Sequence, residues 1–426
     1  MNSNRKVVVT GMGVVSPIGI GTEEFFAALM AGRSGVEVRD EFADSDLPMR
    51  LAAPVTGFEA KQYVKPRKAL KIMCEPIKFG CAAASMAADQ AGLTDLITDD
   101  PVEGQFHVSP DRVGTVFGTE TFFADPHEVA RVFRSCIVDQ DYQHDRWGEF
   151  AMRQIQPLWM LKYLPNMAAS HISIAVNARG PSNSICQGAA SGLLAVIEAA
   201  SLVTRGVADV VIAGGTGSQM ALTAMLYRGT DLLSQSDGEA TAASKPFDKN
   251  RDGMVVGEGA GVVVLESLEH ATARGATPLA EFAGSSRLFC APDSGDRVAG
   301  IESSLRIATE DAQMTTDQIG LVNASASGEL EGDRFEAQAI HNVFGDVPVT
   351  AHKSNFGNLG PGTSVVELIG GLLGLKHQKI PPTINYETAD PQCPVNIVRE
   401  SEDLKQSSVI KTSFSATGQI ATVVFK

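Results

Sequence analysis

The segment KPFDKNRDGMVVGEGAGVVVLESLEHATARGA, residues 245–276, gives the clearest indication of the fold. Its part GAGVVVLESLEHATARG (259–275) joins an apolar β-branched run directly to an Ala-rich helical pattern. The same alternation recurs, with strands predicted at RVGTVFGTE (112–120) and ADVVIAGGTGS (208–218) and a helix between them at GLLAVIEAASLVTRG (192–206). Apolar strands that alternate with helices are typical of an α/β fold with a buried sheet.

The second part of the chain repeats this pattern. Strands are predicted at 279–286, 319–328, 347–355 and 421–426, and helices at 332–345 and 363–377. We therefore expect two similar halves, residues 1–260 and 261–426, which pack as one unit because no low-complexity linker separates them. Residues 120–165 fit neither pattern, and we expect an irregular insertion that covers one face.

The composition excludes several classes of function. The 426 residues carry a formal net charge of −15, whereas nucleic-acid and anionic-membrane binding need a basic surface. No apolar run approaches the ~20 residues that span a bilayer, and the strand pattern at the N-terminus leaves no room for a signal peptide. The six cysteines form no CxxC pair, so we expect a reducing, cytoplasmic setting without a disulfide framework or a zinc site.

One segment reverses the acidic balance. KQYVKPRKALKIMCEPIK, residues 61–78, contains the basic residues Lys61, Lys65, Arg67, Lys68, Lys71 and Lys78. It is either a solvated helix face, as most charge runs are, or a docking patch for an acidic partner. The sequence favours neither alternative over the other.

The glycine-rich start TGMGVVSPIG (10–19) is not a dinucleotide-binding motif. That motif requires the spacing G-x-G-x-x-G, which Gly11, Gly13 and Gly19 do not have. We predict a structural turn at these glycines and no cofactor. The eight histidines show no HxxxH or HxxE spacing, so no metal site is predicted.

Several motifs together resemble the β-ketoacyl synthases, the elongating condensing enzymes of fatty acid and polyketide synthesis. Besides residues 245–276, they are VVVTGMGVVSPIG (7–19), LPNMAASHISI (164–174), GDRFEAQAI (332–340), KSNFGNLG (353–360) and FSATGQIATVVFK (414–426). The resemblance implies a thiolase-like five-layer αβαβα fold of two similar halves and a two-fold dimer built beside the nucleophile strand. It also implies an acyl-carrier-protein partner, which in the family docks on a basic region at about the place of Lys65, Arg67, Lys68 and Lys71.

In the resembled family, a cysteine at a helix N-terminus accepts the acyl chain, and two histidines donate hydrogen bonds to the enolate formed on decarboxylation. The family's nucleophile motif aligns with GPSNSICQGAASG (180–192) without a gap and puts Ala189 at the cysteine's place. A methyl group cannot carry an acyl chain. Cys186 lies three residues earlier, where strand alternation points it to the other face, so we expect a buried and inert thiol.

Both histidine places hold other residues. Ser325 stands at the place of the first histidine and Asn358 at the place of the second. Of the family's polar set of two histidines and one lysine, this chain therefore keeps the lysine, Lys353. Neither a serine nor an asparagine can shuttle a proton near neutral pH. Ser327 and Glu329 stand at the two threonines that usually meet the pantetheine arm.

The last loop, SFSATGQI (413–420), differs from the family in the same way. Phe414 and Ala416 are expected to contact substrate, and Ala416 replaces the aromatic gate of the acyl pocket. Ser415 and Thr417 replace two glycines of the oxyanion-hole loop, and losing even one oxyanion donor typically costs about 10²–10³ in rate.

Four more residues are expected near the site. His352, beside Lys353, is expected to have a structural role at a strand end. Phe122, Phe123 and Phe356 are bulky enough to fill the acyl pocket.

Three functions fit these residues. The favoured one is a condensation-incompetent subunit similar to chain-length factors, in a homodimer or in a heterodimer with an active ketosynthase. The best-known chain-length factors carry glutamine at the place of Ala189, whereas Gln187 lies two residues too early. The alternatives are an acyltransferase or thioesterase that uses Ser325, and an active 3-oxoacyl-[acyl-carrier-protein] synthase that uses Cys186.

Overall fold

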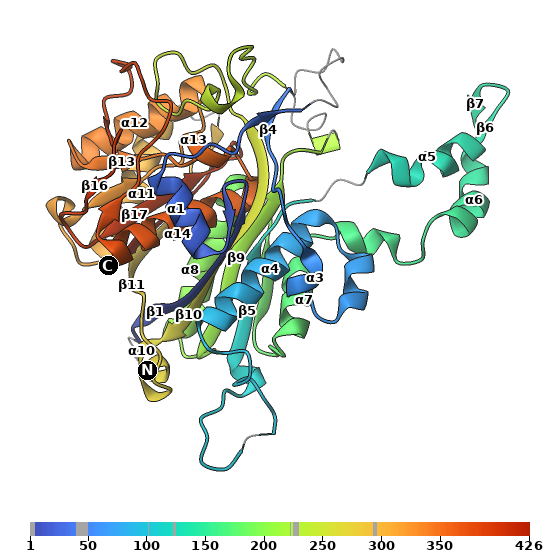
Figure 1. The fold of residues 1–426 in the computed structure, drawn as a ribbon, viewed down its shortest axis with the longest axis horizontal. Helices are drawn as coiled ribbons and strands as arrows, with labels where there is room; N and C mark the ends of the chain where they lie inside the picture. The colour runs from blue at the N-terminus through green and yellow to red at the C-terminus, as the bar shows by residue number, and fades with distance from the viewer. Residues whose placement is uncertain are drawn as a thin grey trace.

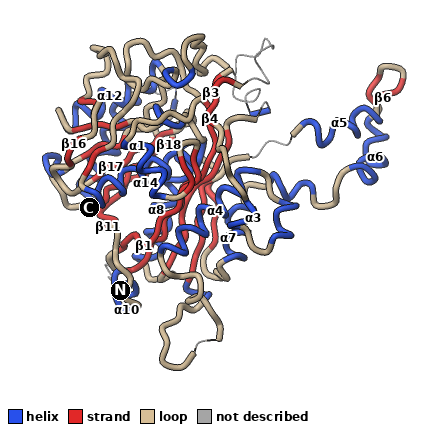
Figure 2. Tube along the Cα trace, viewed as in Figure 1, coloured by secondary structure: helices blue, strands red, loops and turns tan. Residues whose placement is uncertain are grey.

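A computed structural model describes residues 5–39, 50–100, 102–121, 125–221, 223–224, 230–292 and 296–426. One 14-stranded sheet runs through the molecule (Figure 2). Its main path has the order β15 (Asn396–Ile397), β13 (Pro348–Thr350), β12 (Leu321–Asn323), β17 (Val409–Phe414), β18 (Gln419–Phe425), β11 (Ala280–Phe289), β1 (Val7–Ser16), β10 (Val256–Ser267), β9 (Val210–Ser218), β5 (Val113–Gly118) and β8 (Ser182–Ile185).

The two halves of the chain have the same strand order. The first half runs β8, β5, β9, β10, β1 from its edge inward, and the second runs β13, β12, β17, β18, β11, with the two-residue strand β15 added at its edge. In each half the first three strands are parallel and the last three are antiparallel. β1 and β11 join the halves, with Val7 opposite Phe282. The expected division at 260/261 falls within β10, so the strand order assigns β10 and the helix α10 (Leu268–Ala273) to the first half.

Helices form three of the five layers (Figure 1). α8 (Ser191–Thr204) packs on β9 and β5, α14 (Thr363–His377) packs on β10 and β17, and the two helices contact each other between the sheet halves. α4 (Glu75–Gln90) packs on β1, β9 and β10, and α11 (Arg297–Asp311) packs on β11 and β18 with α12 (Leu330–Phe344) beside it. The αβαβα fold that the motifs implied is therefore confirmed.

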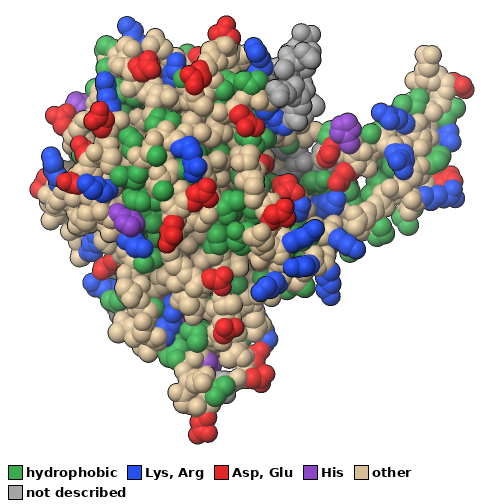
Figure 3. All heavy atoms as spheres, in the orientation of Figure 1, with side chains coloured by type: hydrophobic (Ala, Val, Ile, Leu, Met, Phe, Trp, Pro, Cys, Tyr) green, Lys and Arg blue, Asp and Glu red, His purple; other side chains and the backbone are tan. Residues whose placement is uncertain are grey.

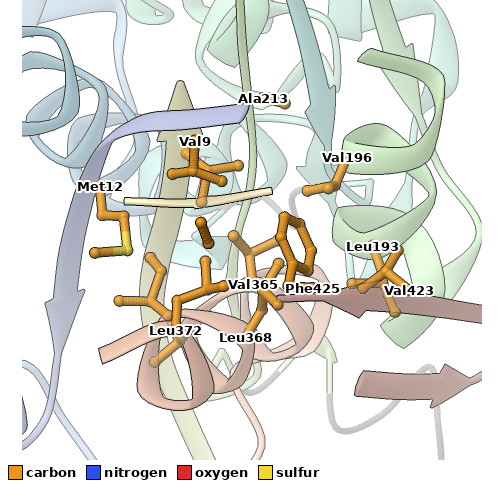
Figure 4. Packing of buried hydrophobic residues seen from close by; sticks show 14 of the residues in the cluster. Val9, Met12, Leu193, Val196, Ala213, Val365, Leu368, Leu372, Val423 and Phe425 are labelled. Atoms are coloured by element: carbon orange, nitrogen blue, oxygen red, sulfur yellow. The ribbon is translucent and has the colours of Figure 1, made fainter. Parts of the chain in front are cut away.

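The middle helical layer lies within the largest hydrophobic core. Every residue of α14 from Thr363 to Leu375 is buried, as is typical of a helix that is surrounded by protein. Figure 4 shows Val365 and Leu368 of α14 beside Phe425 of β18, with Leu193 of α8 close by. This packing fixes the position of the two helix N-termini from which the site is built.

The turn predicted at the first glycines is wrong. Gly11 and Gly13 lie inside the continuous strand β1, whose ten residues are all buried. A Cβ on Gly11 would lie 2.1 Å from the carbonyl oxygen of Ala87, and one on Gly13 would lie 2.0 Å from that of Ala83. The glycines are therefore needed because helix α4 packs directly against the backbone of the strand.

The segment expected to cover one face instead projects from the body as an arm (Figure 1). It contains α5 (Pro126–Ser135), β6 (Ile137–Val138), β7 (Asp141–Tyr142) and α6 (Trp147–Gln154). The Glu128 carboxylate, on α5, stabilises the arm. It accepts hydrogen bonds from the indole N–H of Trp159 (2.6 Å) and the hydroxyl of Tyr163 (2.9 Å), which both follow α6 in the sequence. Here "the arm" means residues 125–164.

The other helices and strands are α1 (Thr22–Met30), α3 (Ala60–Tyr63), α7 (Met167–Ala175), α13 (Lys353–Phe356), β2 (Gly19–Ile20), β3 (Glu37–Val38), β4 (Leu51–Ala53), β14 (Lys379–Ile380) and β16 (Glu402–Asp403). None of the helices in the described ranges combines the length and the apolar composition that a membrane span requires.

Candidate functional site

The turn before helix α8 carries the nucleophile place, and we call residues 186–190 the nucleophile turn. A short 3-10 helix (Gly188–Ala190) leads into α8. The Ser191 hydroxyl donates to the Gly188 carbonyl (2.6 Å) and accepts from the N–H of Gln187 (2.7 Å), which fixes the turn. Ala189 thus stands at the N-terminal end of α8, where the helix dipole favours an anion, but its side chain is a methyl group.

Cys186 is exposed, so the expectation of a buried thiol is wrong. The residue directly follows β8, which is the terminal strand of the sheet and pairs with β5 alone in the part of the chain that the structure describes. Its Sγ lies 3.4 Å from Oγ1 of the buried Thr119. The sequence pattern predicted the strand, but it could not show that this strand lies at the edge of the sheet.

The nucleophile turn packs against the second half of the chain. The Ser413 hydroxyl, at the end of β17, donates to the carbonyl of Ala189 (3.2 Å). A Cβ on Gly188 would lie 3.2 Å from the Cβ of Ser415. The site is therefore assembled from both halves.

The loop after β12, residues 324–328, contains Ser325 at the first histidine place, and we call it the site loop. The Glu336 carboxylate accepts from the N–H of Ser325 (2.7 Å), and the Lys353 ammonium donates to the Ser325 carbonyl (2.6 Å). The Lys411 ammonium donates to the carbonyl of Ala324 (3.0 Å). Buried charged side chains therefore bind three consecutive polar groups of this backbone.

Glu367 connects the two lysines. Its Oε1 lies 3.0 Å from Nζ of Lys353 and its Oε2 lies 2.7 Å from Nζ of Lys411. Glu336, Lys353, Glu367 and Lys411 are at most 3% exposed, and we call them the charge network. A network of two carboxylates and two ammonium groups is formally neutral, which is the condition under which buried charges are tolerated.

The burial of the charge network shifts its pKa values. Burial opposes ionisation of Glu367, but Lys353 and Lys411 more than offset it and lower the pKa of this carboxyl. Burial raises the pKa of Glu336 to about 7, although Lys411 and the N–H of Ser325 act in the other direction. Burial also lowers the pKa of Lys411, which Glu367 opposes.

Among the described residues, the charged group hydrogen-bonded to the Ser325 hydroxyl is an ammonium group. Its Oγ lies 3.5 Å from Nζ of Lys353, which donates to the Ser325 carbonyl and is paired with Glu367. The nitrogen of this lysine is engaged as a donor to the Ser325 carbonyl and to Glu367, so it is not arranged as a base for the serine hydroxyl.

Ser327 and Glu329, which stand at the places of the two threonines that meet the pantetheine arm in the family, contact each other. The Ser327 hydroxyl donates to the Glu329 carboxylate (3.1 Å), and the N–H groups of Ser327 and Gly328 donate to the buried Asp333 (2.9 and 3.0 Å). Burial raises the pKa of Asp333 to about 6, while the N–H of Phe247 and that of Ser327 act to lower it. Asp333 therefore holds the second part of the site loop as the charge network holds the first.

Asn358, at the second histidine place, uses its amide within the structure. Its Oδ1 accepts from the N–H of Gly360 (2.9 Å) and from the hydroxyl of Thr363 (3.3 Å), at the start of α14. Its Nδ2 faces the thioether of Met254 (3.3 Å). The asparagine thus stabilises the turn before α14.

The two positions of the last loop lie at the β17–β18 turn. Phe414 is half-buried and lines a hollow of about 10 Å³, room for about one water molecule. Ala416 is exposed, and its carbonyl accepts a hydrogen bond from Arg297 (2.9 Å). The hydroxyls of Ser415 and Thr417 are 2.9 Å apart and close the turn.

His352 and Phe356 are fully buried. Burial lowers the pKa of His352 to about 4, so the ring is neutral at physiological pH. Phe356 packs in the main core, 6.1 Å from the ring of Phe25. Phe122 and Phe123 lie outside the described residues.

The basic segment forms an exposed surface on and after α3 (Figure 3). Lys61, Lys65, Arg67, Lys68 and Lys71 are exposed, and we call these five residues the basic patch. Lys78 differs, because it lies on α4 and pairs with Glu75. Within the described ranges, no group of three or more His, Cys, Asp or Glu side chains is arranged to hold a metal ion.

Three residues of the charge network were missed from the sequence: Glu336, Glu367 and Lys411. A signal was present, because Glu367 is the one charged residue in the apolar stretch SVVELIGGLLGL, and Lys411 interrupts the strand pattern VIKTSF. The structure brings Ser325 and Lys353 together and pairs Ser327 with Glu329. It places Ala416 on a separate turn and gives Asn358 its own partners.

Two family models match the chain. The β-ketoacyl synthase N-terminal domain matches residues 4–271, and the β-ketoacyl synthase C-terminal domain matches residues 284–387. The 3-oxoacyl-[acyl-carrier-protein] synthase 2 of Vibrio cholerae is 31% identical over 437 residues, which cover 100% of this chain and 99% of the relative. The protein of the same name from Staphylococcus aureus is 30% identical over 435 residues, with the same coverage.

Solved structures are similar over the same length. A β-ketoacyl synthase from Burkholderia phymatum has a TM-score of 0.86 at 27% identity, and the ishigamide ketosynthase/chain length factor has 0.83 at 28%. A type II polyketide synthase acyl-carrier protein in complex with its ketosynthase includes a chain with a TM-score of 0.81 at 25% identity. Each comparison covers 99% of both chains. This chain belongs to the β-ketoacyl synthase family.

Proposed function

We propose that this protein is a condensation-incompetent ketosynthase-like subunit of fatty acid or polyketide biosynthesis, which binds carrier-protein thioesters as a chain-length-factor-like partner. The observation that carries the proposal is the methyl group of Ala189 at the N-terminal end of α8. The helix that would stabilise a thiolate is in place, but the atom that would attack a thioester is missing.

The two other catalytic places support the same proposal. The Ser325 hydroxyl contacts Nζ of Lys353, which is in an ion pair, and Asn358 directs its amide to Gly360, Thr363 and Met254. Neither residue can move a proton near neutral pH. The scaffold persists without this chemistry, since an α/β core does not depend on its site residues.

Intact-protein mass spectrometry after incubation with acyl-carrier-protein and malonyl-carrier-protein thioesters tests the proposal. We expect no covalent acyl adduct and no loss of carbon dioxide from the malonyl group. Ala189→Cys provides a positive control for access: an acyl adduct on this variant, but not on the natural chain, would show that the thioester reaches the turn. Decarboxylation or an adduct on the natural chain contradicts the proposal.

One observation favours a second candidate function, acyl transfer through Cys186. This thiol is exposed, at the end of the nucleophile strand, and lies 3.4 Å from the Thr119 hydroxyl. If Cys186 carries acyl groups, peptide mapping of the same incubation locates the adduct on Cys186, and Cys186→Ala abolishes it. Under the first proposal, Cys186→Ala leaves pathway output unchanged.

The basic patch supports docking of an acidic carrier protein. All five side chains are exposed on a chain with a net charge of −15, so they form a local positive surface. We expect Lys68→Glu combined with Lys71→Glu to weaken carrier binding about tenfold or more, and natural binding to weaken with added salt. Lys376→Glu with Lys405→Glu makes the same charge change elsewhere on the surface and should leave binding unchanged. Equal effects of the two double variants would place the carrier elsewhere.

Pairing with a second ketosynthase-like chain is supported by the edge of the sheet and by the arm. Ser182 and Asn183 of the terminal strand β8 are exposed, and an edge strand with exposed backbone pairs readily with another chain. The arm adds exposed apolar side chains, among them Phe133 at 47%, Ile137 at 51% and Met152 at 87%. Such residues are unusual on a surface that remains in water.

Sedimentation velocity tests the pairing. We expect a dimer of the natural chain, or a heterodimer when an active ketosynthase of the same pathway is added, and dissociation of either when Phe133→Asp and Met152→Asp are combined. Leu330→Asp, at a site that is 60% exposed on another surface, is the matched control. A natural chain that sediments as a monomer with and without the ketosynthase contradicts the pairing.

A further inference from the structure

We propose that Lys411 is a positioning residue of the site, whose ammonium group serves as a built-in cation that holds the site loop. The proposal concerns the shape of the loop and holds whether or not any chemistry remains at Ala189, Ser325 or Asn358. It therefore stands or falls independently of the proposed function.

The position of Lys411 is unusual for a lysine. The side chain lies in strand β17, between Ile410 and Thr412, and is completely buried with 0% exposure. A buried ammonium group is costly unless it is paired and hydrogen-bonded. Its position in a buried strand therefore depends on the partners that it binds.

The partners of Lys411 come from two separate elements. Nζ donates to the carbonyl of Ala324 in the site loop at 3.0 Å and lies 2.7 Å from Oε2 of Glu367 in helix α14. A carbonyl oxygen and a carboxylate oxygen on either side of one compact charge form the donor set that also suits a monovalent cation. The lysine thus joins β17, the site loop and α14 through a single point charge.

Lys353 cannot replace this contact. Its Nζ binds the next carbonyl, that of Ser325, and the other carboxylate oxygen of Glu367. Each lysine therefore binds one carbonyl and one carboxylate oxygen. Removing Lys411 leaves the Ala324 carbonyl buried without its donor, which destabilises this part of the loop.

The charged groups that face Lys411 come from three helices. They are Glu367 from α14, Glu336 from α12, and Lys353 from α13, with the neutral His352 next to it. Glu367 and the ionised form of Glu336 offset part of the cost of burying the Lys411 charge, whereas Lys353 adds to that cost. A neutral side chain of the same size would leave Lys353 alone against two carboxylates.

Hydrogen exchange of the full chain, read by mass spectrometry, tests the proposal. Lys411→Met removes the charge and keeps the volume, and we expect exchange in peptides covering residues 321–328 to accelerate roughly tenfold or more. Peptides from β9 serve as the internal reference for global unfolding and should change less. Lys379→Met, at an exposed ion pair with Asp403, is the matched control and should leave the site-loop peptides unchanged.

Chemical rescue separates positioning from general loss of packing. Lys411→Ala opens a space in which an ammonium ion can stand between the Ala324 carbonyl and Glu367. We expect ammonium chloride to restore the slow exchange of the site loop, and tetramethylammonium chloride at equal ionic strength to fail because the ion is too large and donates no hydrogen bond. Unchanged exchange in Lys411→Met, or equal rescue by both salts, overturns the proposal.

A measurement on the natural chain keeps the proposal testable if neither variant folds. In protein labelled with ¹⁵N at lysine Nζ, buried and hydrogen-bonded ammonium groups exchange slowly with water, whereas exposed ones exchange quickly. We expect two slowly exchanging ammonium resonances, from Lys353 and Lys411, of which one is lost in Lys353→Met. Absence of any slowly exchanging lysine resonance beyond that of Lys353 would overturn the proposal.

Discussion

The site loop and the nucleophile turn come from halves with the same strand order, but they are held in opposite ways. Buried charges bind consecutive polar groups of the site loop, and Asp333 binds its far end. The nucleophile turn follows an edge strand, and Cys186, Gln187 and Gly188 are exposed. Charged side chains thus hold a loop in the interior of one half, whereas the turn of the other half lies at an exposed sheet edge. We infer that the first region maintains the fold of the site and that the second is available to a partner.

The largest effect is expected in the charge network. Glu367→Gln removes the carboxylate between Lys353 and Lys411 and keeps its shape, so two buried ammonium groups remain with Glu336 alone. Breaking a buried ion pair in this way costs roughly 3–5 kcal/mol of unfolding free energy. Urea unfolding should be followed by circular dichroism, because both tryptophans, Trp147 and Trp159, lie in the arm.

The control for that experiment is Asp403→Asn, which breaks the exposed pair with Lys379 and should cause no measurable change. Equal changes in unfolding free energy for the two substitutions would contradict the view that the site loop is held more tightly than the nucleophile turn.

The second effect is a dependence of stability on pH. In the folded protein the pKa of Glu336 is raised from its ordinary value of 4.5 to about 7, so between these values the folded state holds a proton that the unfolded chain has released. Its contribution to stability is therefore fully present below about pH 4.5 and is lost as the pH rises through 7. We expect Glu336→Gln to gain roughly 2–3 kcal/mol relative to the natural chain between pH 5 and pH 8.

Measuring the difference between the two proteins isolates this group. Asp333, with a pKa of about 6, and His352, with a pKa of about 4, titrate in both and cancel to first order. A difference in unfolding free energy that stays constant from pH 5 to pH 8 would show that Glu336 ionises normally and that the interior is less tightly coupled than the contacts indicate.

A smaller effect is expected where the two regions meet. A Cβ on Gly192, in the first turn of α8, would lie 2.5 Å from the carbonyl oxygen of Pro361 and 2.8 Å from Cγ2 of Val365. Gly192→Ala should therefore cost roughly 1–3 kcal/mol of unfolding free energy, because the turn before α14 has to move. Gly148→Ala is the matched substitution in the first turn of α6, where a Cβ meets nothing within 4 Å, and should stabilise the arm slightly. Calorimetry compares the unfolding temperatures of the two variants. Equal shifts would mean that the two helix starts have the same room for a Cβ atom.

The smallest effect is expected at the exposed edge. Cys186→Ser keeps the approximate size of the side chain and its contact with Thr119, so the unfolding free energy should stay within about 0.5 kcal/mol of the natural value. Urea unfolding under reducing conditions gives the number. A loss of several kcal/mol would show that the thiol is a packed part of the fold after all.

The sequence predicted the fold wherever side-chain periodicity reflects burial. The helix expected at 363–377 coincides with α14, and the strands expected around 112–120 and 208–218 contain β5 and β9. The turn expected at Gly11 and Gly13 was wrong, because the local sequence does not distinguish a glycine inside a strand from a glycine in a turn. The close approach of α4 that requires these glycines is a tertiary contact, which no local pattern contains.

The candidate site was predictable in part for a related reason. The alignment with family motifs put Ala189 at the helix start and Ser325 beside Lys353, where the structure has them. It could not find Lys411 or Glu367, because a single charge in an apolar run has no visible partner in the sequence. The exposure of Cys186 depends on which strand lies at the edge of the sheet, and the arm depends on where the chain leaves the body; both follow from strand order rather than from composition.

The pairing of β1 has a consequence for how the protein is made. Among the elements that the structure describes, this strand is synthesised first, whereas its main-sheet neighbours β10 and β11 come more than half the chain later, where Val7 meets Ser267 and Phe282. At ordinary synthesis rates, the ten residues of β1 wait on the order of tens of seconds for both partners. During that time α4 can cover one face of the strand, but most of its backbone groups lack the neighbouring strands with which they are paired in the native state. The nascent chain is thus aggregation-prone until late in translation, and its yield in cells will depend on chaperones that hold the N-terminus.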